Sequence, residues 1–466
     1  MSVKPRELHG WKLFGYNMGY FGIFLNNLLI SVFIFQYYVY TINLDPILTS
    51  IGVSLNLIIT AVSSIIFGVM TDNKKPGRFG KRRPFLLYGM PVWFLSNILI
   101  WIVPWKCPMD NSFYFPTVVY FWIILGINAI TGASMLSAHV SMLPEQSQTH
   151  KNREKVSSWG TILVIIASIL AMLLPLMVQS ILPDPQNVGW WTLSGEILLL
   201  YMPIIGLGFA LFGISSVMMT FFSVDESFHQ IHSNEKIKRT SILDTFRMMK
   251  IPARDKKYRK FLTIQFSNYS SSKILSILVI PFLTFVLQFQ FSEFFIYIII
   301  SISCKFSWFY ISQKIVAKKE FVKSFSWFII LSIIVCMLDL FFLIPSLTFS
   351  SKIILFIATI GTLLGTVYIF GFFAPPLSAA LIYEAALEIN QNELDKTLAK
   401  ISGSYSGLSA FAVAIGQAFA SLMMGFILVG SNKENPIIII LGIASMAIFY
   451  IISLISMKRI ELKPLV

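Results

Sequence analysis

Two lysines lie inside apolar stretches long enough to cross a lipid bilayer. Lys273 and Lys305 are both far from the predicted ends of their stretches, so neither ammonium group reaches the aqueous surface easily. A lysine at the centre of a membrane helix costs about 2.5–3.5 kcal/mol on insertion scales. Asp339 also lies in an apolar stretch, but nearer the outer side. We therefore expect one or both lysines to bind an anionic group of a solute; satisfaction by backbone carbonyls or a packing partner is the alternative.

A second set of charged residues lies where apolar stretches end. Asp72 ends one stretch, and Arg82 and Arg83 begin the next. A lone carboxylate is unfavourable at a helix C-terminus, so Asp72 requires a donor such as Arg82, Arg83 or a helix N-terminus. Glu145 and Arg153 offer a similar contact at the following loop of this kind. We expect these five residues to gate one end of a helix bundle; alternatively, the arginines only follow the preference of basic residues for the cytoplasmic side.

These residues need a membrane protein to position them. The chain has 466 residues, of which 56% are hydrophobic and only 12% charged, with a mean hydropathy of +0.74. Soluble domains carry about a quarter charged residues, so lipid is the expected surroundings. Helices are expected because lipid offers the backbone no hydrogen-bond partners, and the runs lack the alternation of barrel strands. The predicted fold is an all-α membrane protein with twelve transmembrane helices near 13–39, 49–71, 85–105, 115–143, 157–182, 198–223, 261–289, 293–315, 324–345, 352–382, 403–430 and 436–457.

The distribution of basic residues predicts the orientation. Of the 36 lysines and arginines, 31 fall in the two tails, the polar segment 224–260 and alternate loops. Basic loops face the cytoplasm, so both termini are expected there, in a multi-pass protein of the cell membrane. The first residues show no signal-peptide cleavage site and are expected to lead directly into the first helix. The net charge of +14 is then explained by this bias and by anionic lipid, with no need for nucleic acid.

The polar segment 224–260 divides the chain into two halves. It separates six predicted spans from six, as a linker between duplicated halves would. We therefore predict a first six-helix bundle over 1–223, a cytoplasmic linker over 224–260 and a second bundle over 261–466. Within the linker, residues 242–250 are predicted to form an amphipathic helix on the membrane surface.

Several classes of function are excluded on sequence grounds. The chain has no Gly-rich phosphate loop, no Ser/His/Asp set and no metal-ligand cluster, so we expect neither an enzyme nor a cofactor or metal site. The three cysteines show no paired spacing, which argues against disulfides and a redox role.

One loop motif resembles a known superfamily. Gly68-Val-Met-Thr-Asp72, followed by Gly77-Arg-Phe-Gly-Lys-Arg-Arg-Pro-Phe85, resembles the loop between helices two and three of the major facilitator superfamily. Its long spacing and final Arg-Pro-Phe are similar to the glycoside–pentoside–hexuronide:cation symporters and the sucrose transporters. Leu143-Pro144-Glu145 with Arg153 is a second match. A weaker third match is Gly403-Ser-Tyr-Ser-Gly407, after Pro375-Pro376.

The resemblance implies the major facilitator fold, with two pseudo-symmetric six-helix bundles around a cavity lined mainly by helices one, four, seven and ten. Polar residues that share a face of such helices are then candidates for solute binding. Amides, hydroxyls and aromatic faces suit a hydroxylated solute, although helix–helix hydrogen bonding is the alternative for each Ser or Asn. The candidate substrate-binding residues are Asn27, Asn128, Gln265, Tyr269, Lys273, Lys305, Tyr368 and Gln417.

Ion coupling departs from the pattern of the sodium-coupled relatives. Those relatives carry carboxylates where this chain has Thr60 and Ser64, and a lysine near Ala414. A hard cation prefers several anionic oxygens, so a sodium site of that kind is not expected. A proton remains a candidate partner through His139, whose imidazole titrates near neutral pH, or through a desolvated lysine. Packing is the alternative role of His139, and facilitated diffusion also stays open.

Taken together, the sequence predicts a secondary transporter that moves a sugar, glycoside or sugar acid by alternating access. We expect it to function as a monomer in the bilayer. The alternatives are a facilitator, a transporter of an amphipathic or lipid-like solute, and a receptor of the same fold without transport.

Overall fold

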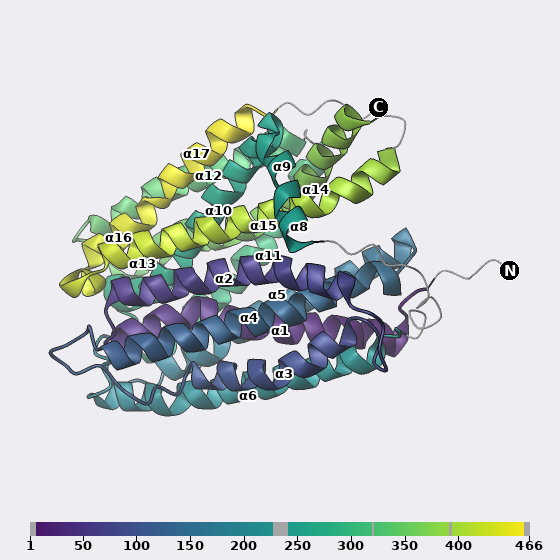
Figure 1. The fold of residues 1–466 in the computed structure, drawn as a ribbon. Coiled ribbons are helices and arrows are strands. Elements are labelled where there is room, and N and C mark those ends of the chain that lie inside the picture. The colour runs from purple at the N-terminus through teal and green to yellow at the C-terminus, as the bar shows by residue number, and fades with distance from the viewer. Residues whose placement is uncertain (1–5, 227–240, 319–320, 391–393, 461–466) are drawn as a thin grey trace. The chain divides into compact units, whose positions relative to one another are not determined.

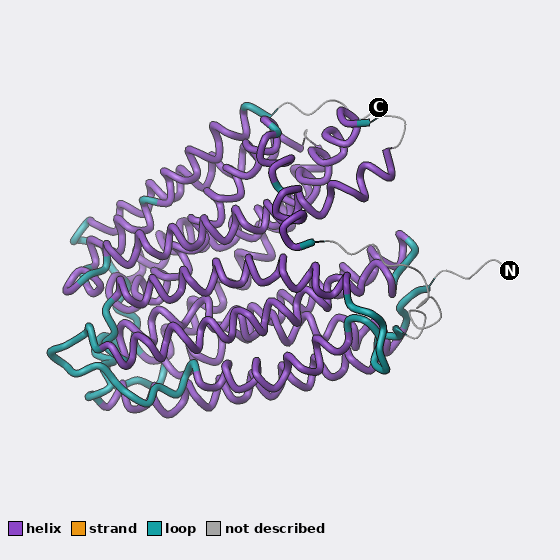
Figure 2. The backbone as a smooth tube through the Cα atoms, in the orientation of Figure 1, coloured by secondary structure: helices purple, strands orange, loops and turns teal. Residues whose placement is uncertain are grey.

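The structure is a computed structural model that describes residues 6–226, 241–318, 321–390 and 394–460. Within these residues the secondary structure is helical, and the only strand-like pairing is an isolated bridge between Gly77 and Gly80. Loops are confined to the ends of the helices (Figure 2). The predicted all-α fold is confirmed.

The first half of the chain forms six long helices (Figure 1). Two of them begin at side-chain caps: the hydroxyls of Thr149 and Thr192 each accept a backbone N–H of the helix that follows. The helices are α1 (Gly10–Gln36), continued by the π-helix η1 (Tyr37–Thr41), α2 (Pro46–Asn73), α3 (Arg83–Leu99), α4 (Phe115–Gln146), α5 (His150–Gln179) and α6 (Leu193–Ser223).

The second half repeats this count after two short helices, and several of its spans are built from consecutive pieces. The short helices are α8 (Ile242–Met248) and α9 (Lys250–Arg254). The spans are α10 (Lys256–Pro281) with η2 (Phe282–Val286); η3 (Phe291–Glu293) with α11 (Phe294–Lys318); α12 (Phe321–Leu338) with η4 (Asp339–Leu343); α13 (Phe349–Phe356), η5 (Ile357–Gly361) and α14 (Thr362–Ile389); α15 (Leu394–Ile427), followed by η6 (Gly430–Glu434); and α16 (Pro436–Ala444) with α17 (Met446–Lys458).

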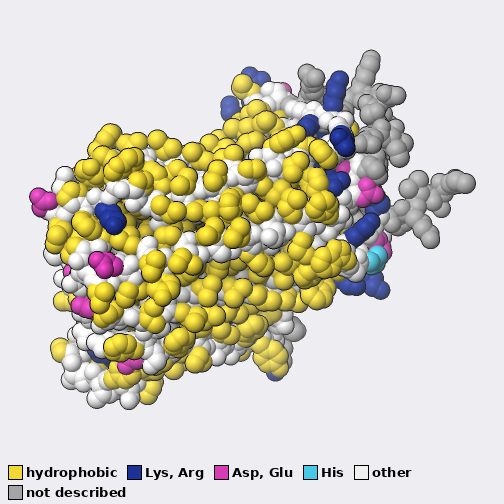
Figure 3. All heavy atoms as spheres, turned by 90° about the horizontal axis from the view of Figure 1, so that it is seen from below, with side chains coloured by type: hydrophobic (Ala, Val, Ile, Leu, Met, Phe, Trp, Pro, Cys, Tyr) yellow, Lys and Arg dark blue, Asp and Glu magenta, His cyan; other side chains and the backbone are white. Residues whose placement is uncertain are grey.

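Eleven helical segments of the described residues are long and apolar enough to cross a membrane. The twelfth is α3, whose 17 residues lie at the short end of the spanning range of about 17–25. The face drawn in Figure 3 is covered by hydrophobic side chains, and the charged side chains gather at its two ends. The prediction of twelve transmembrane helices is therefore confirmed.

The chain divides into two compact units. The first contains residues 1–44 and 55–242, and the second contains 45–54 and 243–466. Residues 45–54, which include the start of α2, therefore belong with the second unit, where the Ser54 hydroxyl donates to the carbonyl of Ala418 at 2.9 Å. The sequence-based boundary at 223 did not foresee this exchange.

The first spanning helix of each half of the chain ends in the same unusual way. Both α1 and α10 continue into a π-helix, and both are followed by a non-glycine residue in the left-handed region, Asn43 (φ 64°) and Gln288 (φ 56°). The same pair of backbone hydrogen bonds closes each end: Ile42 to Tyr37 and Leu44 to Tyr38 in the first unit, Leu287 to Phe282 and Phe289 to Leu283 in the second. This correspondence is a structural trace of an internal repeat.

In the first unit, α1 packs closely on α6. The approach uses glycines: a Cβ atom added at Gly19 would lie 2.2 Å from the Thr220 hydroxyl oxygen. That hydroxyl accepts the N–H of Gly19 at 3.0 Å and donates to the carbonyl of Gly15 at 2.8 Å. Such small-residue contacts replace the hydrophobic effect, which does not drive helices together in lipid.

Candidate functional site

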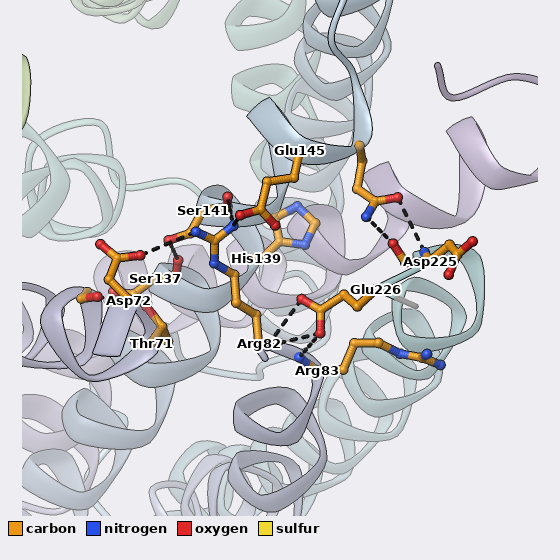
Figure 4. Close-up of polar contacts among 12 residues, drawn as sticks. Thr71, Asp72, Arg82, Arg83, Ser137, His139, Ser141, Glu145, Asp225 and Glu226 are labelled. Carbon is orange, nitrogen blue, oxygen red and sulfur yellow. Dashed lines mark hydrogen bonds and ion pairs between the residues drawn. The ribbon is translucent and has the colours of Figure 1, made fainter. Parts of the chain in front are cut away.

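Arg82 is the centre of a charged cluster at one end of the first unit. It directly precedes α3, and its side chain is only 9% exposed. One guanidinium nitrogen lies 3.2 Å from a carboxylate oxygen of Asp72, at the end of α2. The other lies 2.8 Å from Glu145, at the end of α4, and donates to the carbonyl of Ser141. The guanidinium therefore joins the ends of α2 and α4 to the start of α3 (Figure 4).

The two carboxylates of this cluster differ in burial. The side chain of Asp72 is 60% exposed, whereas that of Glu145 is 22% exposed. Exposed ion pairs contribute about 0–1 kcal/mol because water screens them, and the effect of losing one partner grows with burial. The shorter and more buried contact to Glu145 is therefore the dominant restraint on Arg82.

Glu226 is a member of this cluster that the sequence did not reveal. It is 1% exposed, and its carboxylate accepts the backbone N–H of Arg82 at 3.0 and 3.1 Å and that of Arg83 at 3.3 Å. A carboxylate at this position satisfies the free N–H groups of α3 and opposes the positive end of its dipole. Gly80 adopts φ +83°, and a Cβ atom there would lie 2.1 Å from a Glu226 oxygen, so only glycine leaves room for this contact.

The neighbouring residue of Glu226 is held as well. The Gln146 side chain donates to the Asp225 carbonyl at 2.5 Å and accepts the Asp225 N–H at 3.3 Å. The start of the predicted linker is thus docked on the first unit. Burial lowers the pKa of Lys74, and the nearby negative charge of Glu226 acts against that shift. The only sequence signal for Glu226 is its place just after the sixth helix, 144 positions from its partner Arg82.

The side chains of the remaining two gating candidates lie outside this cluster. The Arg83 guanidinium stacks over the ring of Phe221 at 4.2 Å. Arg153 donates from Nε to the carbonyl of Ser147 at 2.8 Å, while Glu145, its expected partner, has its ion pair with Arg82. The structure therefore brings together Asp72, Arg82 and Glu145 of the five predicted residues.

His139 lies in the packed interior of the first unit. It is 3% exposed and stacks on Tyr16 with ring centroids 4.4 Å apart, and on Tyr20 at 6.0 Å. The Tyr16 hydroxyl donates to the backbone carbonyl of His139 at 2.9 Å. Within the described part of the chain, its Nδ1 atom has no hydrogen-bond partner.

The substrate-binding candidates of the first unit differ in environment. Asn27 on α1 is partly exposed. Asn128 on α4 is buried, and its amide donates to the hydroxyl of Ser96 on α3 at 3.2 Å. That bond is the helix–helix role that the sequence left open for asparagines.

In the second unit, three candidates share one face of α10. Gln265, Tyr269 and Lys273 are spaced four residues apart, which aligns them along the helix. Lys273 is 4% exposed, and Gln265 donates to the hydroxyl of Ser409 on α15 at 3.3 Å. Of the rest, Lys305 and Gln417 are partly exposed, and the side chain of Tyr368 lies outside the described residues.

A second polar cluster, at the start of α10, also escaped the sequence. Lys257 forms an ion pair with Glu384 of α14 at 2.5 Å. Asp255 caps α10 and accepts the hydroxyl of Tyr405 at 3.2 Å. The Tyr258 hydroxyl donates to the carbonyl of Tyr405 at 2.7 Å. These contacts tie α10, α14 and α15 together, as Arg82 ties three helices of the first unit.

The comparisons with known proteins agree on the kind of protein. The MFS/sugar transport protein family matches residues 15–436. An uncharacterized symporter of Synechocystis sp. is 21% identical over 187 residues, which cover 40% of this chain and 34% of that protein, about a third of its length. The nucleoside transporter NupG superposes with a TM-score of 0.61 at 13% identity, covering 97% of this chain and all of that one.

The inward-open xylose transporter XylE from E. coli gives a similar result, with a TM-score of 0.59 at 13% identity over 96% of this chain and 94% of that one. At such identities these likenesses show the fold, and the family match, which spans most of the sequence, shows the family. The resemblance expected from the loop motif is confirmed. The chain belongs to the MFS/sugar transport protein family and is a membrane transporter of the major facilitator type.

Proposed function

We propose that this transporter moves a sugar, glycoside or sugar acid by alternating access, as a monomer with both termini in the cytoplasm. The observation that carries the proposal is the Arg82 cluster. A partly buried ion pair contributes little net stability, because desolvation offsets its attraction. Contacts of this kind suit a gate that must break and re-form as helices move. The basic residues of the same loop support placing this gate on the cytoplasmic side.

The solute class is supported by the polar face of α10. An ammonium group, a phenol and an amide lie along that face at Lys273, Tyr269 and Gln265. The amide and phenol can pair with hydroxyl groups, and the ammonium can pair with a carboxylate. A buried lysine in a membrane helix is itself an indication of function. We therefore favour a sugar acid, with Asn27, Asn128, Lys305, Tyr368 and Gln417 as further candidates for contact.

The driving force belongs to the proposal as well. A carboxylate pair like that of the sodium-coupled relatives is missing where Thr60 and Ser64 stand, so a proton is the favoured coupling ion. His139, buried against Tyr16 and Tyr20, is the candidate within the first unit. Its protonation would add a charge to a closely packed aromatic site and so favour a rearranged state.

A binding screen tests the solute class. The purified protein is heated with neutral sugars and sugar acids, at two pH values and with or without sodium, and the unfolding temperature is recorded. A ligand at 100 times its Kd stabilises a protein by about 2.7 kcal/mol, which is easily measured. We expect sugar acids to stabilise the wild type and to lose that effect in Lys273→Gln.

Lys314→Gln, which changes an exposed lysine of α11, is the matched control and should retain the shift. An equal stabilisation of Lys273→Gln by sugar acids would show that the ammonium group does not bind the solute. Stabilisation by neutral sugars alone would move the proposal from sugar acids to uncharged sugars.

A further inference from the structure

We propose that Asp339 is a proton-carrying carboxyl of the second unit, which takes up and releases the proton that drives transport. The inference rests on the proposed function, since it names a coupling group for that same transport cycle. It concerns a residue that the gate and the solute face do not use.

Asp339 is completely buried. It opens η4, the continuation of α12, and its exposed fraction is 0%. Within the described residues, neither carboxylate oxygen has a hydrogen-bond partner. An ionised carboxylate without donors is among the most costly groups to bury, whereas a protonated carboxyl costs far less. The surroundings therefore favour the proton-bound form.

The hydroxyl of Thr359 can serve as the hydrogen-bond acceptor for a proton on the Asp339 carboxyl. This hydroxyl lies beside the Asp339 carboxyl and donates to the carbonyl of Leu355 at 2.9 Å. A hydroxyl has a single proton, so this bond leaves only lone pairs for Asp339. Lone pairs repel a carboxylate but accept a hydrogen bond from a carboxylic acid. A small turn of the side chain would thus pair the protonated acid with Thr359.

The same threonine lies in a helix segment that can change shape. Thr359 belongs to the π-helix η5, which joins α13 to α14 and packs on α12. π-helical turns hold an extra residue, are rare, and occur often at functional sites. A return of η5 to regular α-helix would move Thr359 relative to Asp339. This change offers a way to expose the acid in one state and bury it in another.

In the part of the chain that the structure describes, the other ionisable groups near Asp339 provide no cation to pair with its carboxylate, so a proton is its expected partner. The elements that pack on η4 are α12, α13 and α16. α12 presents the thiol of Cys336, with Tyr450 of α17 behind it, and α16 and η5 contain no ionisable side chain. Lys352 of α13 directs its ammonium to the carbonyl of Val286 at 3.5 Å.

A sodium ion would need several oxygen ligands. One carboxylate and one hydroxyl, from Asp339 and Thr359, make a sparse set for a metal but a sufficient one for a proton.

Two measurements on Asp339→Asn test the proposal. The first is infrared spectroscopy of the purified protein in lipid, titrated with pH. The wild type should show a carboxylic-acid band that is missing from Asp339→Asn and unchanged in Glu434→Gln, which alters an exposed acid of the same unit. This readout needs no solute. A spectrum without an Asp339-dependent band would overturn the proposal.

The second measurement compares two transport modes in proteoliposomes with labelled glucuronate as the probe. Counterflow exchanges solute without a driving ion, whereas accumulation under an imposed pH gradient requires coupling. Asp339→Asn should keep counterflow but lose at least about tenfold of the pH-driven accumulation, equal to about 1.4 kcal/mol of coupling. Unchanged pH-driven accumulation would overturn the proposal, as would accumulation driven by sodium alone. Absence of counterflow in both proteins would instead count against the proposed function.

Discussion

At the scale of single residues, the proposed gate depends on how Arg82 divides its contacts. The guanidinium is nearly enclosed, and it contacts one exposed carboxylate, Asp72, and one largely shielded carboxylate, Glu145. Removing one partner of a buried pair costs about 3–5 kcal/mol, while an exposed pair is worth about 0–1 kcal/mol. The loop motif drew attention to Asp72, but burial assigns the larger role to Glu145.

A pair of substitutions tests this ranking. Glu145→Gln should lower the initial rate of uptake by about tenfold or more, because Arg82 is left without its buried partner. Asp72→Asn should lower it by only about twofold, since water already screens that contact. Rates are measured in proteoliposomes, with the amount of folded protein checked by size-exclusion chromatography. Equal losses for the two variants would contradict the ranking.

The residues of this site were predictable to different degrees. Asp72 and Arg82 are ten positions apart around one loop, so their pairing followed from the chain's local geometry. Glu226 contacts Arg82 across 144 positions, and no local pattern marks such a contact. Asn128 shows the same limit: its type indicated a polar role, but only the packed helices identify Ser96 as its partner.

At the scale of elements, hydropathy located every spanning helix but not its ends. The stretch predicted at 261–289 begins at Lys256, because Asp255 caps the helix there. The stretch predicted at 352–382 extends over Phe349–Ile389, since polar turns can lengthen a helix into water. Hydropathy also gives no sign of the π-helices, because a slipped hydrogen bond changes no side chain.

Helix contacts in the second unit allow a matched test of packing. A Cβ atom at Gly416 of α15 would lie 2.4 Å from the backbone oxygen of Phe266 on α10. At Gly403 of the same helix, nothing lies within 4 Å. Gly416→Ala should therefore lower stability by about 1–3 kcal/mol, the usual cost of overpacking. Gly403→Ala should be neutral or should stabilise by up to about 1 kcal/mol through helix propensity.

Thermal unfolding in detergent, followed by light scattering and intrinsic fluorescence, measures both variants. An unfolding temperature for Gly416→Ala equal to that of the wild type would show that α10 and α15 approach less closely than the structure places them.

At the scale of the whole molecule, composition alone determined the class. So few charges among so many apolar residues require lipid, and the long polar segment placed a boundary between two sets of six helices. The exchange of residues 45–54 into the second unit could not be predicted, because it depends on contacts between distant helices. The same backbone hydrogen bonds recur at the ends of α1 and α10, although the side chains at the two ends are barely similar.

The central claim is that this chain carries its solute as an alternating-access transporter, and counterflow in proteoliposomes tests it most directly. Vesicles with the purified protein are preloaded with one unlabelled sugar or sugar acid and diluted into a trace of its labelled form. We predict a transient accumulation of label above the outside concentration that saturates and is abolished by Arg82→Gln. Uptake no greater than in protein-free vesicles across the whole panel, from protein shown to be folded, would contradict the account.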